Sequence, residues 1–262
     1  MRSLLLVAAL AAARCAASQE LVSLPTRPGV TKPFVILSMQ GREAAAIALL
    51  YIGGGGRINA RTEDGKLMFG ARNFLPRSGA EFARNGVLPV VMDAPSDQRE
   101  LSDAYREGRE QTADARPVIA ELKRRYPGLP LYVVGTSRGT ISAAYVGRDL
   151  GQELAGVVLT SSLFGSGAPR RMAQSLRGFD YAQIQSRLLF VHHREDSCEH
   201  TPYSEAARLG ARYDLISVRG GKPAESAACE PFAAHGYYGK EAPTVDAMAA
   251  WMLKRPFPRE IE

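Results

Sequence analysis

Short apolar runs alternate with helix-like stretches along most of this chain, and that alternation limits the folds open to it. The apolar runs are continuous rather than apolar at every second residue, which is typical of strands buried on both faces. The expected strands are residues 30–38, 47–52, 87–92, 131–134, 157–160, 188–191 and 213–218. The expected helices are residues 78–85, 102–126, 138–150, 202–209 and 244–253. The pattern predicts an α/β fold in which helices cover both faces of a mostly parallel central sheet.

The length of the chain suits one domain of this kind. It has 262 residues and no sequence unit that recurs at a fixed period. We therefore expect residues 19–262 to form a single domain. Residues 165–181 interrupt the alternation and are rich in Gly, Arg and Ser. This stretch is predicted to form either a short lid over a site or a solvent-exposed connection.

The first 18 residues have the order of a secretory signal peptide. Arg2 gives a positive start, residues 4–13 are apolar, and small residues follow. The apolar stretch is shorter than the ~20 residues that a membrane-spanning helix needs. We expect residues 1–18 to be a signal peptide, the mature chain to lack an integral membrane segment, and the protein to be secreted or periplasmic. Lipid attachment at Cys15 is the alternative, although Arg14 is a poor neighbour for a lipoprotein cleavage site.

The cysteine count agrees with export. Once the leading segment is removed, the chain keeps two cysteines, Cys198 and Cys229. An even pair in an oxidising compartment predicts one disulfide, which would stabilise the fold by on the order of 3–4 kcal/mol. The alternative is a pair of buried free thiols.

The charge of the chain does not indicate a nucleic-acid partner. Its formal net charge is +6, but Lys and Arg are spread along the sequence rather than clustered. The densest patch, residues 123–125, falls at the end of an expected helix, where cations interact favourably with the helix dipole. We expect no binding to nucleic acid.

One short motif carries chemistry. Gly135-Thr136-Ser137-Arg138-Gly139 matches G-x-S-x-G and lies between an expected strand and an expected helix. In this setting the glycines permit a turn so tight that a side chain at either position would meet the neighbouring strand or helix. The serine is then held in a strained backbone with its hydroxyl exposed, which favours a role as a nucleophile. The alternative is an ordinary strand–helix turn with an incidental serine.

With this motif in this setting, the chain resembles the α/β-hydrolase superfamily, and in particular secreted bacterial-type serine esterases. The resemblance implies the α/β-hydrolase fold and a chain order of Ser, then Asp or Glu, then His. It places the base after the last strand and before the closing helix. Of the four histidines, His192, His193, His200 and His235, only His235 occupies that place.

The resemblance places the acid just after the strand at residues 188–191. Asp196 is the expected acid, because a Cys198–Cys229 bridge would tie its loop to the loop of the base. Glu195 is the second candidate, and Asp93, after an earlier strand, is a less usual alternative. The acid would fix the tautomer of the base and stabilise the imidazolium.

Two backbone donors are expected to stabilise an oxyanion. The resemblance assigns one to the N–H of Arg138 and the other to the glycine loop after residues 47–52. Gly54 and Gly55 are the candidates there, without a choice between them. The histidine that often heads this loop in the family is absent, and Tyr51-Ile52 stands in its place.

Metal and cofactor chemistry are not expected. Adjacent residues on a strand point to opposite faces, so His192 and His193 cannot readily share one ion, and no HExxH or CxxC spacing is present. The glycine loop also lacks the GK[ST] that would follow in a phosphate-binding loop.

The function that these residues imply is hydrolysis of a carboxylic ester in a small-molecule or acyl substrate, through an acyl-enzyme on Ser137. A peptidase, an amidase or an acyltransferase would use the same groups. A non-catalytic binding protein on this fold is an alternative from another class. A lid-gated lipase or polyester depolymerase is a further alternative, against which Arg170 and Arg171 in the lid stretch argue.

Overall fold

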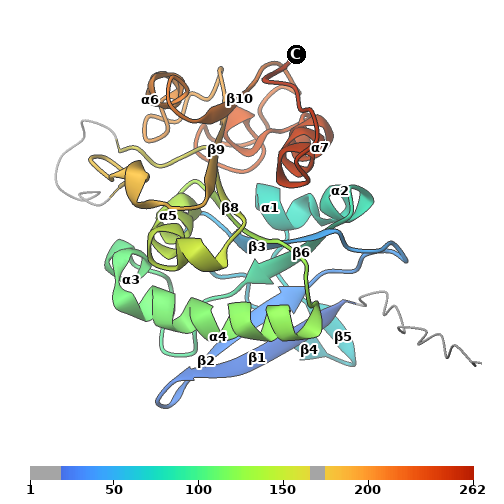
Figure 1. Cartoon of the computed structure of the whole chain (residues 1–262). Coiled ribbons are helices and arrows are strands. Elements are labelled where there is room, and N and C mark those ends of the chain that lie inside the picture. The colour runs from blue at the N-terminus through green and yellow to red at the C-terminus, as the bar shows by residue number, and fades with distance from the viewer. Residues whose placement is uncertain (1–18, 166–174) are drawn as a thin grey trace, which may run out of the picture.

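The computed structural model describes residues 19–165 and 175–262, and its centre is a nine-stranded sheet (Figure 1). The strand order is β1-β2-β6-β3-β7-β8-β9-β10-β11. These strands are β1 (Glu20–Arg27), β2 (Val30–Ile36), β3 (Ala46–Tyr51), β6 (Val87–Met92), β7 (Leu131–Thr136), β8 (Gly156–Thr160), β9 (Arg187–His193), β10 (Asp214–Val218) and β11 (Glu260–Ile261). A separate exposed hairpin consists of β4 (Arg61–Glu63) and β5 (Lys66–Met68).

Most of the large sheet is parallel. The strand pairs from β6 through β3 to β11 are all parallel, whereas β1 pairs with β2, and β2 with β6, in antiparallel register. Each of β3, β6, β7 and β8 is buried along its whole length. Their apolar residues face helices on both sides, which is why the sequence runs are continuous rather than alternating.

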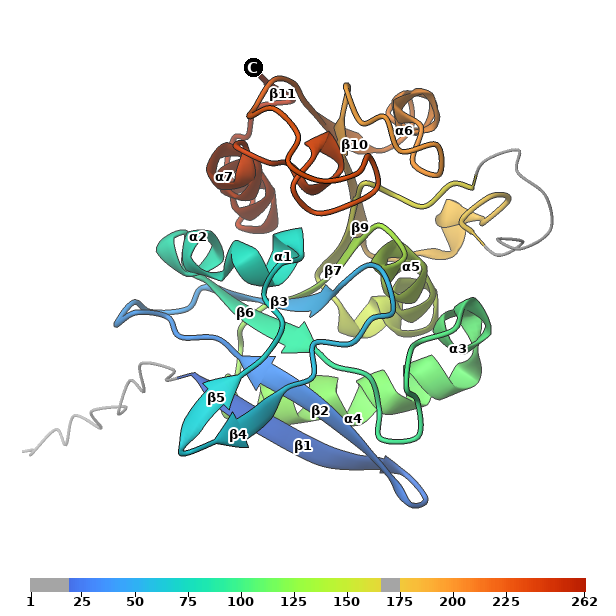
Figure 2. The ribbon, with the colours of Figure 1, turned by 180° about the vertical axis from the view of Figure 1, so that it is seen from behind.

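Helices cover both faces of the sheet. They are α1 (Phe74–Arg77), α2 (Gly79–Arg84), α3 (Asp103–Glu107), α4 (Arg109–Arg125), α5 (Gly139–Leu150), α6 (Tyr203–Leu209) and α7 (Glu241–Met252), with short 3-10 turns at η1 (Gly151–Glu153), η2 (Tyr181–Gln183) and η3 (Ala234–Gly236). One core lies between the sheet and α4, α5 and α6, which face the viewer in Figure 1. A second core lies between the sheet and α1, α2 and α7, which are seen from their own side in Figure 2. The predicted architecture is confirmed.

The structure corrects one expected helix and adds strands that were not expected: β1, β4, β5 and β11. Residues 102–126 form two helices, because Gly108 adopts an extended conformation with φ −79° and ψ 165°. Gly108 ends α3 and is the N-cap residue of α4. Pro117 lies inside α4. β1, which pairs with β2 at the edge of the sheet, was not expected from the sequence, because its alternating polar residues and Pro25 weaken the strand pattern.

Two predictions fall wholly or partly outside the described residues. The expected signal peptide, residues 1–18, lies outside them, as do residues 166–174 of the expected lid at residues 165–181. The described part of that stretch includes a buried Tyr181 at the start of η2. No helix within the described ranges, 19–165 and 175–262, has the length and apolar character needed to cross a bilayer.

Candidate active site

The chain turns sharply at Ser137, between β7 and α5. Ser137 has a φ of 53°, in the left-handed region that residues other than glycine rarely adopt. Its N–H donates to the Thr160 carbonyl at 3.1 Å, and its own carbonyl accepts the Thr140 N–H at 2.9 Å. The Thr140 hydroxyl donates to the same carbonyl at 2.6 Å. These bonds hold a backbone conformation that costs roughly 1–3 kcal/mol where nothing supports it.

Three glycines leave no room for a side chain around this turn. A Cβ on Gly135 would lie 2.5 Å from the carbonyl oxygen of Gly139. A Cβ on Gly139 would lie 2.1 Å from the carbonyl oxygen of Tyr51, at the end of β3. A Cβ on Gly53 would lie 2.9 Å from the Cβ of Ser137. The sequence therefore needs glycine at each of these positions for the serine to lie beside the start of the glycine loop.

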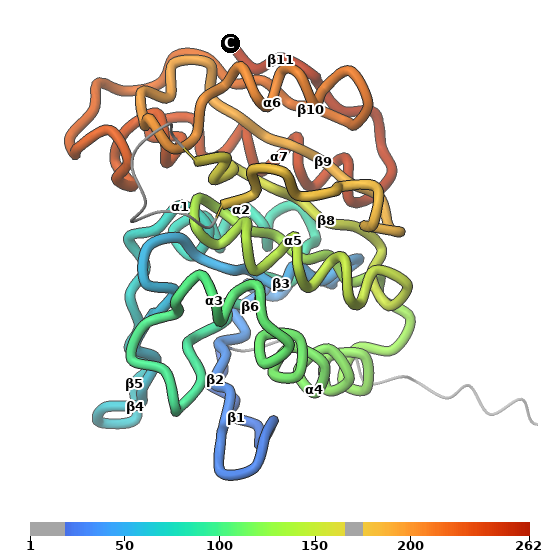
Figure 3. The backbone as a smooth tube through the Cα atoms, turned by 90° about the vertical axis from the view of Figure 1, so that its left-hand side faces the viewer, coloured from blue at the N-terminus to red at the C-terminus, as the bar shows by residue number. Residues whose placement is uncertain are grey.

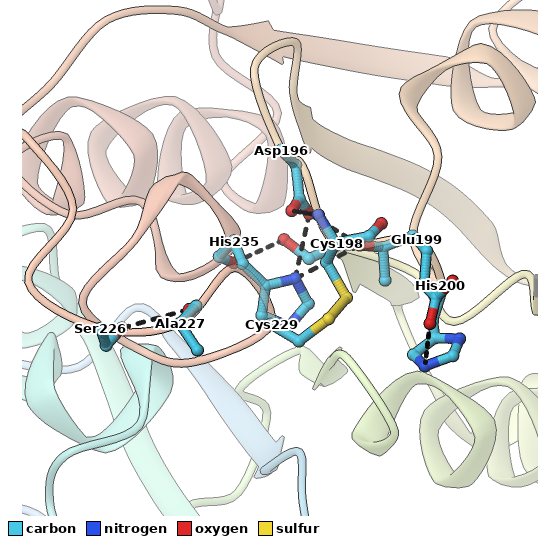
Figure 4. Close-up of a disulfide and its surroundings, with 10 residues drawn as sticks. Asp196, Cys198, Glu199, His200, Ser226, Ala227, Cys229 and His235 are labelled. Atoms are coloured by element: carbon cyan, nitrogen blue, oxygen red, sulfur yellow. Dashed lines mark hydrogen bonds and ion pairs between the residues drawn. A yellow bond between two sulfur atoms is a disulfide. The ribbon is translucent and has the colours of Figure 1, made fainter.

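Asp196 and His235 meet in the loops that follow β9 and β10 (Figure 4). The Asp196 Oδ2 lies 3.0 Å from the His235 Nδ1, and the Asp196 side chain is fully buried. Asp196 also accepts the Cys198 N–H at 3.0 Å and the Thr201 hydroxyl at 2.8 Å. A carboxylate at Nδ1 favours the imidazole tautomer that carries its proton there, which leaves Nε2 able to accept one.

A disulfide joins these two loops. Cys198 and Cys229 form the bridge, as the cysteine count predicts (Figure 4). Cys198 follows Asp196 by two residues, and Cys229 precedes His235 by six. The bridge therefore ties the loop of the carboxylate to the loop of the imidazole at a point close to both.

Ser137 and His235 line one pocket of about 210 Å³ at the carboxyl edge of the sheet. The pocket is lined by Ile52, Gly53, Gly54, Asn73, Phe74, Thr136, Ser137, Cys229, Glu230, Pro231, His235 and Gly236. Ser137 is half-buried and His235 is 5% exposed. In the described part of the chain no hydrogen bond joins the Ser137 hydroxyl to His235. Such bonds are often long in substrate-free enzymes.

The two expected sources of oxyanion donors both lie next to Ser137, because Arg138 follows it in the chain and the glycine loop begins against it. Gly54 lines the pocket, whereas Gly55 packs against the side chain of Glu100, with its Cβ position 3.1 Å from the Glu100 carboxyl carbon. Arg138 is the N-cap residue of α5, and its guanidinium pairs with Asp103 at 2.6 Å, away from the lining of the pocket. Of the two loop candidates, Gly54 is therefore the one beside the serine.

The other candidate acids have different partners. Glu195 accepts the Gly220 N–H at 3.0 Å, and its side chain is 60% exposed. The buried Asp93 carboxylate accepts the N–H groups of Ile58 and Ala60, each at 2.8 Å. Asp93 thus holds the segment that follows the glycine loop, and of the three candidate acids only Asp196 contacts His235.

His192 and His193 bind separate partners on β9. His192 Nε2 accepts the Ser162 N–H at 2.7 Å, and burial lowers the pKa of His192 to about 3. His193 Nε2 lies 2.9 Å from the Gly220 carbonyl. Within residues 19–165 and 175–262, no group of three or more His, Cys, Asp or Glu side chains is placed to hold a metal ion.

Sequence reasoning missed several residues that support the site. Thr201 bonds Asp196 and lies 3.3 Å from the His235 Nδ1. Tyr237, two residues after His235, has a φ of 57° and donates its buried hydroxyl to the Val191 carbonyl at 2.7 Å. The Gly-rich, aromatic context of His235 signalled an unusual loop, but nothing in the sequence marked Thr201, because its contact depends on how the loop after β9 folds back.

Comparisons with known proteins identify the fold through structure rather than sequence. No protein-family model matches the chain, and no curated protein matches it. A solved α/β serine hydrolase homologue from Coxiella burnetii matches with a TM-score of 0.58 and 13% identity, over 90% of this chain and 96% of that one. Est1E from Butyrivibrio proteoclasticus matches with a TM-score of 0.59 and 12% identity, over 89% and 98% of the two chains.

A third solved structure, from Xanthomonas campestris, is described as an α/β serine hydrolase without a lid. It matches with a TM-score of 0.54 and 12% identity, over 92% of this chain and 95% of that one. The three matches span about nine-tenths of this chain and nearly the whole of the others. The protein therefore has the α/β-hydrolase fold.

Proposed function

We propose that this protein is a serine hydrolase that cleaves carboxylic esters. The observation that carries the proposal is the buried Asp196–His235 pair, joined at 3.0 Å, whose His235 lines the same pocket as a serine held at a left-handed φ of 53°. A serine hydroxyl is a weak nucleophile at neutral pH and needs an adjacent base, and the base needs a group that orients it. Structural neighbours described as esterases and serine hydrolases support the same class.

The first half of the reaction forms an acyl-enzyme. The Ser137 hydroxyl attacks the ester carbonyl carbon while His235 Nε2 takes its proton, and the carbonyl oxygen becomes an oxyanion. Asp196 stabilises the resulting imidazolium without taking the proton itself. The tetrahedral intermediate collapses, the proton passes from His235 to the alcohol oxygen, and the alcohol leaves.

The second half releases the acid. Water attacks the acyl-enzyme carbonyl with His235 as base, a second oxyanion forms, and its collapse returns the proton to Ser137. Both oxyanions need donors aimed at the place where negative charge develops. We assign one donor to the N–H of Arg138 and the other to the glycine loop, with Gly54 preferred over Gly55 because only Gly54 lines the pocket.

The size of the pocket favours a short acyl group. Its volume of about 210 Å³ is below the roughly 300–1,000 Å³ of pockets that enclose drug-sized ligands. We therefore expect acetyl and butyryl esters to be better substrates than octanoyl esters, as judged by kcat/KM. This expectation separates a short-chain esterase from a lipase or a polyester depolymerase, which would prefer the longer chain.

The decisive test is hydrolysis of a series of p-nitrophenyl esters by purified protein and matched variants. Ser137→Ala and His235→Gln are expected to lower kcat at least about 10³-fold, and Asp196→Asn by roughly 10³–10⁴-fold. The chain provides controls beside each residue. Glu195→Gln changes the carboxylate next to Asp196, and His200→Gln changes another histidine near the disulfide, and both are expected to keep most of the activity.

Two results would overturn the proposal. A wild-type rate no greater than that of Ser137→Ala would indicate a non-catalytic binding protein on this fold. If Glu195→Gln loses as much kcat as Asp196→Asn does, the assignment of Asp196 as the acid would be wrong. Parallel assays with p-nitroanilides and with added alcohol acceptors separate ester hydrolysis from amide hydrolysis and acyl transfer, which would use the same three side chains.

Export is a separate part of the proposal. The disulfide supports an oxidising compartment, since such bridges are rare in the cytosol, and residues 1–18 have the order of a signal peptide. Expression in a Gram-negative host followed by fractionation and N-terminal sequencing tests it. We expect the protein in the periplasm or medium, beginning near Ser18, and an intact N-terminus in the cytosol would contradict export.

A further inference from the structure

Arg106 places a buried positive charge directly behind the glycine loop. It belongs to α3 and its side chain is completely buried. One terminal nitrogen donates to the Gly54 carbonyl at 2.9 Å and the other donates to the Ser142 hydroxyl at 3.1 Å. Within the described ranges it forms no ion pair with a carboxylate. Burial, with a smaller contribution from Arg138, lowers the pKa of Arg106 to about 9, so it is still charged at pH 7.

Burying a charge without a paired carboxylate costs free energy, so the contacts that Arg106 makes must compensate for its burial. Asp103, on the same helix, is engaged by the Arg138 side chain through bonds of 2.6 and 3.1 Å. The Arg106 guanidinium instead bonds two neutral oxygen atoms. One belongs to the loop that lines the pocket, and the other belongs to α5, the helix that begins just after the serine.

The bond to the Gly54 carbonyl completes the support of the loop. Gly54 has a φ of 57°, which glycine adopts readily. The peptide group before Gly54 is fixed because the Gly53 carbonyl accepts the Gly56 N–H at 3.1 Å. The peptide group after it is fixed by Arg106. A Cβ on Gly56 would lie 2.6 Å from the Arg106 guanidinium, so glycine at that position makes room for the arginine.

The helix α3 therefore contacts both of the segments that are assigned as oxyanion donors. It holds the Arg138 side chain through Asp103, and it holds Gly54 through Arg106. In the tube view α3 lies beside α4 and α5, consistent with its packing against both helices (Figure 3). A run of four glycines is flexible in the unfolded chain, and outside contacts such as these must select one conformation of it.

We propose that Arg106 is a positioning residue for oxyanion stabilisation: by holding the Gly54 carbonyl it restricts the loop that supplies the Gly54 N–H as a donor, and its charge favours the developing negative oxygen. This inference rests on the proposed function, because it concerns the intermediate formed by Ser137. Preorganised donors and charges of this kind act most strongly where water is excluded. Arg106 acts through Gly54 and need not touch the substrate.

The test compares Arg106→Met and Arg106→Lys with a matched arginine far from the pocket. Arg187, at the opposite end of β9 from Asp196, also donates to a backbone carbonyl, that of Trp251 at 2.9 Å, and stacks on its ring. Arg187→Met is therefore the control for losing a partly buried arginine that supports the backbone. Thermal midpoints and circular dichroism report folding of all three variants.

Two functional readouts separate positioning from general stability. The first is the split between kcat and KM on p-nitrophenyl acetate. The second is inhibition by an alkyl trifluoromethyl ketone. Ser137 Oγ bonds to the ketone carbon, the C=O π bond opens to an alkoxide, and the serine proton moves to His235. This stable adduct carries the same oxyanion as the intermediate, so its affinity reports on the donors directly.

Arg106→Met is expected to lower kcat by about 10–100-fold and to weaken the ketone by a similar factor, while KM changes less than about threefold. Arg106→Lys keeps the charge but can reach only one of the two oxygens, and its kcat is expected between those of wild type and Arg106→Met. Arg187→Met is expected to keep kcat and ketone affinity even where its thermal midpoint falls.

The inference is overturned if folded Arg106→Met keeps wild-type kcat, or if Arg187→Met loses as much kcat at an equal loss of midpoint. It is also overturned if kcat falls without weaker binding of the ketone. If Arg106→Met does not fold, the test depends on Arg106→Lys. Unchanged kcat and ketone affinity in that variant would show that Arg106 does not position the oxyanion donor. An inactive wild type would instead refute the proposed function, so the two failures are distinguishable.

Discussion

The buried His192 makes the free energy of unfolding of this protein depend on pH under acidic conditions. Its imidazole is fully buried, accepts the Ser162 N–H at Nε2, and stacks on the Phe164 ring with centroids 5.3 Å apart. Burial lowers its pKa from 6.5 to about 3. Protonation would put a charge in the core and would remove the acceptor of the Ser162 N–H, so the native state keeps the ring neutral.

The sign of the effect follows from proton binding. Between pH 6.5 and pH 3 the unfolded chain binds a proton at His192 that the folded protein does not bind. The free energy of unfolding therefore falls as pH falls through this window and is insensitive to His192 above it. The cost is about 2 kcal/mol on going from pH 7.5 to pH 5.0, and it approaches about 5 kcal/mol near pH 3.

Urea unfolding of wild type and His192→Gln at pH 7.5 and pH 5.0, without reductant, measures this directly. Glutamine can still accept the Ser162 N–H but does not titrate. All other ionisable groups are common to both proteins, so their contributions cancel in the comparison. We expect the variant to lose about 2 kcal/mol less than wild type between the two pH values. Equal losses would show that His192 does not cause the pH dependence.

Three further predictions concern the supports of the site. Thr201→Val removes one bond to Asp196 and is expected to lower kcat about two- to tenfold with little change in KM, and unchanged kinetics would contradict it. Serine at both Cys198 and Cys229 is expected to lower the free energy of unfolding by about 2–4 kcal/mol, seen as a lower urea midpoint; a midpoint equal to wild type would count against the bridge. Gly139→Ala forces a Cβ to within 2.1 Å of a backbone oxygen of β3 and is expected to lower the thermal midpoint sharply, whereas a wild-type midpoint would show that the turn relaxes.

Much of the fold could be predicted because it depends on local signals. Continuous apolar runs identify buried strands. The turn at Ser137 could be recognised from its flanking glycines, which contacts with adjacent elements require. The choice of Asp196 over Glu195 rested on the resemblance and on its distance from Cys198, and the structure brings Asp196 to His235 at 3.0 Å.

What could not be predicted depends on contacts between distant segments. The bond from Thr201 to Asp196 forms because the loop after β9 folds back on itself. The bond from Arg106 to Gly54 joins residues 52 positions apart. The break at Gly108 was missed because the flanking sequences are both helix-forming, and one glycine in such a stretch is often tolerated. Both α3 and α4 pack against α5, a contact that the local sequence does not reveal.

The most direct test of the central claim is labelling with a fluorophosphonate, followed by peptide mass spectrometry. The probe reacts with a serine only where a base activates it and an oxyanion site receives the phosphonyl oxygen. We predict one adduct, on the peptide that contains Ser137, and its loss in Ser137→Ala and in His235→Gln. Labelling at another serine, or none at Ser137 in folded wild-type protein, would contradict the account.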